Sequence, residues 1–356
     1  MPELQGMGHG QAAPELRRGL IVAWQGGLLA WCLAHVAIGA AGTWLARRYA
    51  LQRKLIDQPG ERRSHLVATP RGGGIAIAAS ASLALAWLAS TDAIPMPIAG
   101  LVGVGLLLVS GIGWVDDHRP LSPWSRLGVQ AVAAALVAIA LLLAGHQPLS
   151  AAFGFAVVMV LVNVWNFMDG IDGLAASQAL LVAACWALLA WPGPWAWMLV
   201  ALVAACLGFL PFNLPPARIF LGDVGSGALG YLLAVGLLWL PAGEPHWPWL
   251  AWLPLSAFLV DAALTLLVRM LRGERWWAPH MQHAYQRWSA RLGRHGTVSM
   301  AYALWTVSAV VATLVLAREV KMGGSVIALG TGYMAAVAAW GWLRRERMPQ
   351  EGGSKP

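Results

Sequence analysis

Apolar residues in this 356-residue chain fall in long uninterrupted runs, whereas a water-soluble domain has short periodic ones. A bilayer core of about 30 Å needs roughly 20 helical residues to cross it. Runs of about this length recur along the chain and predict an all-α, polytopic integral membrane protein. The eleven predicted spans are residues 21–45, 75–90, 98–115, 127–144, 151–167, 174–191, 195–212, 226–240, 247–268, 298–317 and 325–343.

The basic residues predict which way the chain crosses the membrane. If the amino terminus is outside, 20 of the 24 Lys and Arg residues fall on the inner side. The positive-inside rule therefore predicts a periplasmic amino terminus and a cytoplasmic carboxyl terminus in a bacterial inner membrane. The first span is longer than the apolar part of a signal peptide, and its basic flank follows it, so we expect it to be retained; its processing stays open.

Composition supports a single membrane domain over residues 1–356. Only 11% of the residues are charged and 58% are apolar, which excludes a water-soluble globule. The three cysteines lie inside apolar runs, so neither a disulfide framework nor a zinc site is indicated. The net charge of +8 is explained by inner loops, and nucleic acid is not expected as a partner. The expected parts are a leader (1–20), two long cytoplasmic loops (46–74 and 269–297) and a cytoplasmic tail (344–356).

Five aspartates lie at the predicted cytoplasmic ends of spans. Carboxylates near a bilayer are costly unless they are paired, hydrated or bound to cations. Any one of them could be a hydrated acid at a helix end, but five on one surface indicate a functional site. They are Asp116, Asp117, Asp169, Asp172 and Asp223.

Two glycine-containing segments surround three of these acids. Residues 163–173 place two amides and two acids around two glycines, so the backbone can approach a ligand closely. Residues 220–227 form a Gly-rich turn that opens a helix, whose N–H groups can bind an anion while Asp223 holds a divalent cation. Together the segments predict a site for a phosphate compound bound to Mg²⁺.

Two inner loops offer basic and imidazole groups. Arg62 and Arg63 precede His65, and Arg71 precedes three glycines. Because arginine matches phosphate oxygens, this loop suits an anionic lipid head group, and a positive-inside anchor is the alternative. The other loop contains His280, His283 and His295, for which phosphate or sugar contacts are favoured over structural zinc. Asp261, inside a span, is interpreted as a residue that pairs or packs between helices.

The ordered motifs resemble the polyprenyl-phosphate N-acetylhexosamine-1-phosphate transferases, which start O-antigen and related polysaccharides, and more distantly the phospho-N-acetylmuramoyl-pentapeptide transferase of peptidoglycan synthesis. The resemblance extends from about residue 57 to 297 and implies eleven spans with the amino terminus outside. It rests on five blocks: Arg63-Ser64-His65 with Thr69 to Gly74, Asp116-Asp117, Asn163 to Gly173, Phe220 to Ser226, and His280 to Gln286.

The resemblance implies roles for individual residues. Asp116 and Asp117 would form the catalytic centre, and Asp223 would bind Mg²⁺, for which Mn²⁺ could substitute. Phe220 would stack on the uracil base. The implied nucleotide-binding residues are Asn166, Asp169, Gly170, Ile171, Asp172, Asn213 and Phe220, and the implied sugar- and phosphate-binding residues are Arg63, His65, Arg71, His280 and His283.

The predicted reaction transfers N-acetylhexosamine 1-phosphate from a UDP-sugar to undecaprenyl phosphate and releases UMP, at the cytoplasmic face. The peptidoglycan enzyme has three consecutive histidines where this chain has His280 and His283, which favours the polysaccharide branch, particularly members that use 6-deoxy sugars. The alternatives are the peptidoglycan transferase and, from another class, a transporter of an anionic solute. The sugar (GlcNAc, GalNAc or a 6-deoxy N-acetylhexosamine), the glycan, the proton-handling aspartate and the oligomeric state, including a homodimer, stay open.

Overall fold

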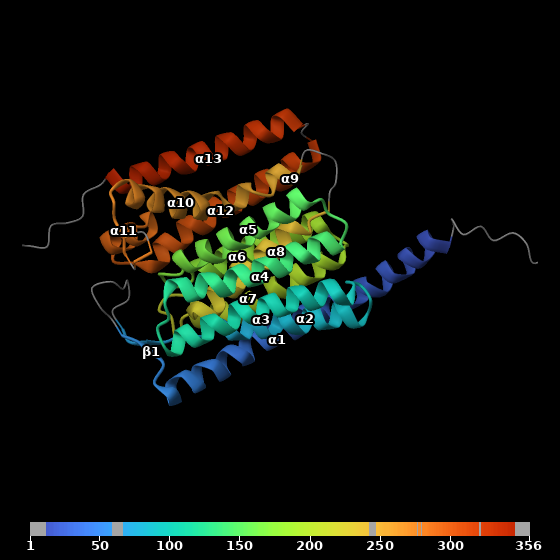
Figure 1. Ribbon diagram of the computed structural model, residues 1–356, viewed down its shortest axis with the longest axis horizontal. Helices are drawn as coiled ribbons and strands as arrows, with labels where there is room; N and C mark the ends of the chain where they lie inside the picture. Colours follow the sequence, from blue (N-terminus) through green and yellow to red (C-terminus); the bar gives the residue numbers. More distant parts are fainter. Residues whose placement is uncertain are drawn as a thin grey trace, which may run out of the picture.

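The computed structural model is a bundle of long helices and describes residues 12–58, 67–241, 247–275, 277–278, 280–319 and 322–345 (Figure 1). A short antiparallel pair, β1 (Ile56–Asp57) and β2 (Thr69–Pro70), lies at one end of the bundle. The helices are α1 (Ala12–Arg53), α2 (Ile75–Ser90), α3 (Met96–His118), α4 (Pro123–Leu143), α5 (Pro148–Phe167), α6 (Leu174–Ala190), α7 (Pro194–Asn213), α8 (Gly222–Leu238), α9 (Trp247–Leu250), the 3-10 helix η1 (Leu253–Leu255), α10 (Ser256–Leu271), α11 (Ala284–Leu292), α12 (His295–Glu319) and α13 (Met322–Arg345).

Among the described residues, eight helical segments are long and apolar enough to cross a membrane, and α2, α6 and α8 are shorter apolar helices. The predicted all-α, polytopic membrane architecture is therefore confirmed. The number of spans and the orientation of the termini remain predictions.

The structure differs from the predicted spans mainly at their ends and in the ninth span. Helix α1 continues to Arg53, and α11 lies inside the second predicted loop. The predicted span 247–268 is divided into α9, η1 and α10. Pro254 lies inside η1, and because proline lacks a backbone N–H donor, an uninterrupted α-helix is unfavourable there.

Helix α8 lies at the centre of the bundle and packs against α3 and α5. Nearly all of its residues are buried, as expected for a helix that is apolar on every side. Large aromatic residues in α8 and in its neighbours bury their rings and still satisfy their polar atoms: Tyr231 of α8 donates to Val102 O (2.8 Å), Trp165 to Ala175 O (3.1 Å) and Trp186 to Ala251 O (3.0 Å).

At one end of the bundle, the last residues of α3 and α7 meet the segments where α2, α6 and α8 begin. Asp117, near the end of α3, accepts a hydrogen bond from Asp223 N at the start of α8. Asn213, at the end of α7, accepts one from Gly173 N just before α6. Gly74 N, just before α2, donates to Leu221 O (2.9 Å). These contacts bring together motifs that are far apart in the sequence.

Candidate active site

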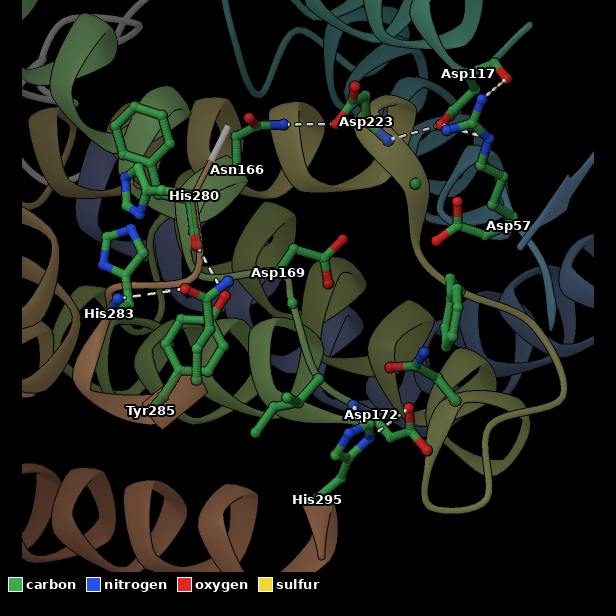
Figure 2. Close-up of a pocket in the computed structure, with 18 of the residues that line it drawn as sticks. Asp57, Asp117, Asn166, Asp169, Asp172, Asp223, His280, His283, Tyr285 and His295 are labelled. Atoms are coloured by element: carbon green, nitrogen blue, oxygen red, sulfur yellow. Dashed lines mark hydrogen bonds and ion pairs between the residues drawn. The ribbon is translucent and has the colours of Figure 1, made fainter. Parts of the chain in front are cut away.

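A cavity of about 590 Å³ lies at this end of the bundle (Figure 2). Its wall is formed by helix ends and loops that lie between β1 and the first residue of α12 in the sequence. It is lined by Asp57, Arg71, Asp117, Arg126, Asn166, Phe167, Asp169, Gly170, Ile171, Asp172, Asn213, Phe220, Gly222, Asp223, Trp277, Ala278, His280, His283, Tyr285, Gln286 and His295.

Asp117 joins α3 to the first turn of α8. Its Oδ1 accepts from Asp223 N (3.1 Å) and its Oδ2 from Val224 N (3.2 Å), so the carboxylate satisfies two N–H groups that lack a partner within the helix. Arg71 donates to the Asp117 backbone oxygen, and Arg71 Nε lies 3.8 Å from Asp117 Oδ1. The side chain of Asp117 is only 3% exposed, so it holds the site together as well as facing the cavity.

Asp223 is held between a cation and an amide. Arg126 Nη1 donates to Asp223 Oδ2 (3.1 Å) and to Asp116 Oδ2 (2.8 Å), which bridges the two acids. Asn166 Nδ2 donates to Asp223 Oδ1 (2.7 Å), as Figure 2 shows. Arg126 therefore supplies a countercharge that prevents the two carboxylates from repelling each other.

Gly222 is required by both its conformation and its surroundings. Its φ of +75° is in the region that favours glycine, and a Cβ there would lie 2.6 Å from Asp117 Oδ2. The turn before α8 can thus bring the Asp117 carboxylate close to the helix N-terminus only with glycine at this position.

The opposite wall of the cavity is built around Asp172 and Asn213. Asp172 Oδ1 lies 3.1 Å from His295 Nδ1, and its Oδ2 accepts from Ala217 N (3.0 Å). Asn213 accepts from Gly173 N (3.1 Å) and donates to Ile219 O (3.0 Å). These contacts connect the start of α6, the end of α7 and the loop before α8, so the wall has a defined shape before any ligand binds.

Asp169 projects into the space between the two walls (Figure 2). Burial, followed by the nearby charges of Asp117 and Asp172, raises the pKa of Asp169 to about 8. Asp169 is therefore largely protonated at pH 7 and can donate a hydrogen bond to a ligand.

Gly170, next to Asp169, allows Tyr285 to reach the same loop. A Cβ on Gly170 would lie 2.2 Å from the Tyr285 hydroxyl, which donates to Phe167 O (3.0 Å). The glycine is thus explained by a close contact between the loop and α11.

The segment that carries His280 and His283 is held by Asp261 of α10. Asp261 accepts from Ala284 N (2.8 Å), Tyr285 N (3.1 Å) and Tyr302 Oη (2.9 Å). The predicted pairing role of Asp261 is confirmed, and its Oδ1 lies 3.5 Å from His283 Nδ1.

His280 faces the cavity beside His283, with 4.9 Å between the ring centroids. Burial, followed by electrostatic repulsion from His283 and Arg269, lowers the pKa of His280 to about 4. His280 is therefore neutral at pH 7, and its ring can donate or accept a hydrogen bond.

The structure brings together nearly all of the predicted site residues that it describes. Asp116 is the one among them that does not line the cavity. It is paired with Arg126, and Leu121 N donates to its Oδ1 (2.6 Å). Arg63 and His65 lie outside the described residues. The lining residues to which sequence reasoning gave no individual role are Asp57, Arg126, Phe167, Trp277, Ala278, Tyr285 and Gln286.

The carboxylate oxygens of Asp117 and Asp223 are suitable ligands for Mg²⁺. Within the described ranges, no three His, Cys, Asp or Glu side chains are placed to hold a metal ion together. Mg²⁺ is commonly bound through only one or two carboxylates, with substrate phosphates and water completing its coordination. Asp117 and Asp223 face the cavity from two helices and match that donor set.

The central part of the chain is similar to a known protein family. Residues 99–240 match glycosyl transferase family 4. Together with the relatives described below, the match supports the resemblance to the polyprenyl-phosphate N-acetylhexosamine-1-phosphate transferases, and the matched segment contains Asp117, Asp169 and Asp223.

Several mycobacterial proteins are similar over a longer stretch. The decaprenyl-phosphate N-acetylglucosaminephosphotransferase of Mycobacterium leprae is 34% identical over 241 residues, and that of Mycobacterium tuberculosis is 32% identical over 238. The one from Mycolicibacterium smegmatis is 31% identical over 237 residues. Each alignment covers 58% of this chain, and the chain spans 57 to 58% of the length of these relatives.

Proposed function

We propose that this multi-pass membrane protein transfers N-acetylhexosamine 1-phosphate from a UDP-sugar to undecaprenyl phosphate and releases UMP. The product would be the first lipid-linked intermediate of a surface polysaccharide of the O-antigen type. The mycobacterial relatives are named as transferases of N-acetylglucosamine phosphate to a polyprenyl phosphate, which supports this class of donor and acceptor.

One observation carries the proposal. Acids, amides, an aromatic ring and imidazoles predicted to bind a Mg²⁺-nucleotide line one cavity at the ends of apolar helices. A soluble anionic donor and a lipid with an anionic head group can meet only at such a position, between water and membrane. A transporter is less well supported, because its charged residues are expected near the bilayer midplane.

In this proposal, the residues that line the cavity bind Mg²⁺ and the nucleotide and position the donor for the reaction. Asp223 and Asp117 would hold Mg²⁺, which would neutralise the diphosphate of the donor. Phe220 would stack on the base, and the loop of Asp169 and Asp172 would hydrogen-bond the nucleotide. Positioning and charge neutralisation supply most of the catalysis in phosphoryl transfer, so no strong base is needed.

We favour direct attack by the lipid phosphate over attack by an aspartate. Direct attack forms a bond between the lipid phosphate oxygen and the β-phosphorus of the donor and breaks the bond from that phosphorus to the UMP oxygen. In the alternative route Asp117 or Asp116 would be the nucleophile, yet both carboxylates are engaged by hydrogen bonds in the structure.

An exchange experiment distinguishes these routes. A covalent sugar-phosphate intermediate would allow labelled UMP to enter UDP-sugar without any lipid acceptor, whereas direct attack would not. We expect no exchange in lipid-stripped protein. Exchange at a rate comparable with turnover would assign the nucleophile to the aspartate pair.

The reaction itself is tested with purified protein, undecaprenyl phosphate and a panel of donors. We expect UMP and lipid-linked sugar phosphate from UDP-N-acetylhexosamines, including UDP-GlcNAc, UDP-GalNAc and a 6-deoxy donor, and no product from UDP-N-acetylmuramoyl-pentapeptide. Product from the pentapeptide donor alone would favour the peptidoglycan reaction. Absence of product with every donor would contradict the proposal.

The orientation is tested separately. A reporter fused after Arg291 is expected to be cytoplasmic and one fused after Glu244 periplasmic, because the basic residues then lie on the inner side. The opposite pattern would place the cavity outside the cell, away from a UDP-sugar donor.

A further inference from the structure

A second cavity, of about 190 Å³, lies between α10, α12 and α13 and shares no lining residue with the first. Its wall is almost entirely apolar and rich in tryptophan. Among the residues that line it are Trp288, Trp305, Ala336, Trp340, Trp342 and Leu343. The side chain of Trp342 is 59% exposed, so the groove opens at the outside of the bundle.

Basic residues gather beside this groove. Arg344 follows the lining residue Leu343, and its guanidinium lies over the Trp340 ring at 4.7 Å from the centroid. Arg272 and Arg287 are close enough to repel Arg344 electrostatically. Arg291 Nη2 donates to Leu343 O (2.5 Å), which brings another guanidinium to the same end of α13.

Arg344 has a buried donor that the described residues do not satisfy. Its Nη1 is buried without a hydrogen-bond partner. The acids within electrostatic range are Asp261 and Glu274. Glu274 is paired with Arg269 (3.0 Å) and accepts from Gln282 (2.8 Å), and Asp261 holds the start of α11. Neither acid makes an ion pair with Arg344 in the part of the chain that the structure describes.

A buried donor among like charges is unfavourable unless it meets an acceptor. The groove is lined by residues in the carboxyl-terminal half of α13, and α13 packs against α11. In a membrane protein, basic pockets between helix ends recognise anionic lipid head groups. The apolar groove and the arginines are complementary to the two parts of such a lipid.

We propose that this groove binds an anionic phospholipid, with the head-group phosphate on Arg344 and an acyl chain along the tryptophan-lined wall. Arg272 and Arg287 add positive charge around the phosphate. The site is separate from the proposed transferase site and does not depend on the proposed reaction.

The proposal is tested by titrating the delipidated full-length protein with phosphatidylglycerol and with phosphatidylcholine of the same acyl chains, with bound lipid counted by native mass spectrometry. We expect the protein to bind phosphatidylglycerol more tightly. Arg344→Gln should weaken that binding about tenfold, because a charge-assisted hydrogen bond is lost. The exposed neighbour Arg345 is the matched control, and Arg345→Gln should change the affinity less than about twofold.

Two outcomes overturn the head-group site. One is equal affinity for the two lipids in the unmodified protein, and the other is an equal loss from Arg344→Gln and Arg345→Gln, which indicates general surface attraction. If Arg344→Gln does not purify as a folded protein, Arg287→Gln is the second variant, expected to weaken phosphatidylglycerol binding alone.

A third variant tests the acyl-chain part of the site. Ala339 lines the groove, and Ala339→Trp fills it. We expect this variant to bind both lipids more weakly, whereas unchanged binding would place the acyl chains elsewhere.

Competition separates a membrane phospholipid from other phosphates. Undecaprenyl phosphate and inorganic phosphate are added to protein that carries phosphatidylglycerol, and the KM for undecaprenyl phosphate is measured for Arg344→Gln. An unchanged KM and retained phosphatidylglycerol support the proposal. Displacement by undecaprenyl phosphate together with a raised KM would identify the occupant as the acceptor, and displacement by inorganic phosphate alone would show a plain anion site.

Discussion

The carboxylates in two regions of the first cavity differ in their hydrogen-bond partners and in the charges around them. On one wall, Asp117 and Asp223 are held by backbone N–H groups, an amide and Arg126. In the loop between the walls, Asp169 makes no hydrogen bond or ion pair with any described residue, and its pKa is raised to about 8. Hydrogen bonds and the positive charge of Arg126 stabilise the ionised form of the carboxylates of the wall. Asp169 has no such partners within the described ranges, so retaining its proton avoids the desolvation free energy of a buried charge. The comparison predicts that the wall governs turnover and that the loop governs the fit of the nucleotide.

The largest effect is expected from the wall. Asp223→Asn keeps the shape of the side chain and removes the charge proposed to bind Mg²⁺, so kcat should fall by about three orders of magnitude in a UMP-release assay. Asp92, an exposed acid beyond the far end of α2, is the matched control, and Asp92→Asn should leave kcat unchanged. Near-normal turnover of Asp223→Asn at saturating Mg²⁺ would show that the Asp223 carboxylate is not a principal Mg²⁺ ligand in the reaction.

A smaller effect is expected from the nucleotide side of the cavity. Phe220→Ala should raise the KM for every UDP-sugar about tenfold, because stacking on the base does not depend on the sugar. KM values for two donors with different sugars check this. A changed order of preference between the donors would show that Phe220 contacts the sugar instead.

The contact between Gly170 and Tyr285 should affect stability. Gly170→Ala places a Cβ against the Tyr285 hydroxyl and should lower the free energy of unfolding by about 1 to 3 kcal/mol. Gly128→Ala, in α4 with open space around the position, is the control and should not destabilise. Thermal unfolding of Gly170→Ala with Tyr285→Phe should show a smaller loss than the sum of the single changes. Additive losses would mean that the two side chains do not interact.

The smallest effect concerns the pH dependence of stability. Since folding raises the pKa of Asp169, the folded protein binds more protons than the unfolded chain between about pH 4 and 8. The stability of the unmodified protein relative to Asp169→Asn should therefore fall as pH rises through this window and level off above pH 8. Tm values of both proteins in EDTA-containing buffer from pH 5 to 9 measure this difference. A constant difference across the range would show that Asp169 is ionised in the folded protein.

Sequence reasoning was sufficient for features that depend on one segment at a time. Long apolar runs indicated the helices, and the acids of the Asn163 to Gly173 segment were correctly grouped with Asp223. The role of Arg126 was missed because a basic residue in an inner loop already has an explanation in the positive-inside rule, and nothing local indicates that it bridges Asp116 and Asp223. Contacts between distant segments determine such roles.

The same limit explains the residues missed around His283. Tyr285 follows the predicted histidines and could have been included for that reason, yet its contact with Gly170 depends on how α11 lies against the loop after α5. His295 was predicted with the other histidines to contact phosphate or sugar, and only the structure places it 3.1 Å from Asp172.

Helix length has a consequence for how the two proposed substrates meet. Helices α2, α6 and α8 contain 16, 17 and 17 residues and are therefore about 24 to 26 Å long, shorter than a hydrocarbon core of about 30 Å. All three begin at the cavity end of the bundle, after Gly74, Gly173 and Leu221. In a membrane, we therefore expect the cavity ends of these three helices to lie no higher than the level of the lipid phosphates. A polyprenyl phosphate can then approach sideways without leaving the bilayer, and only the soluble nucleotide has to change its depth.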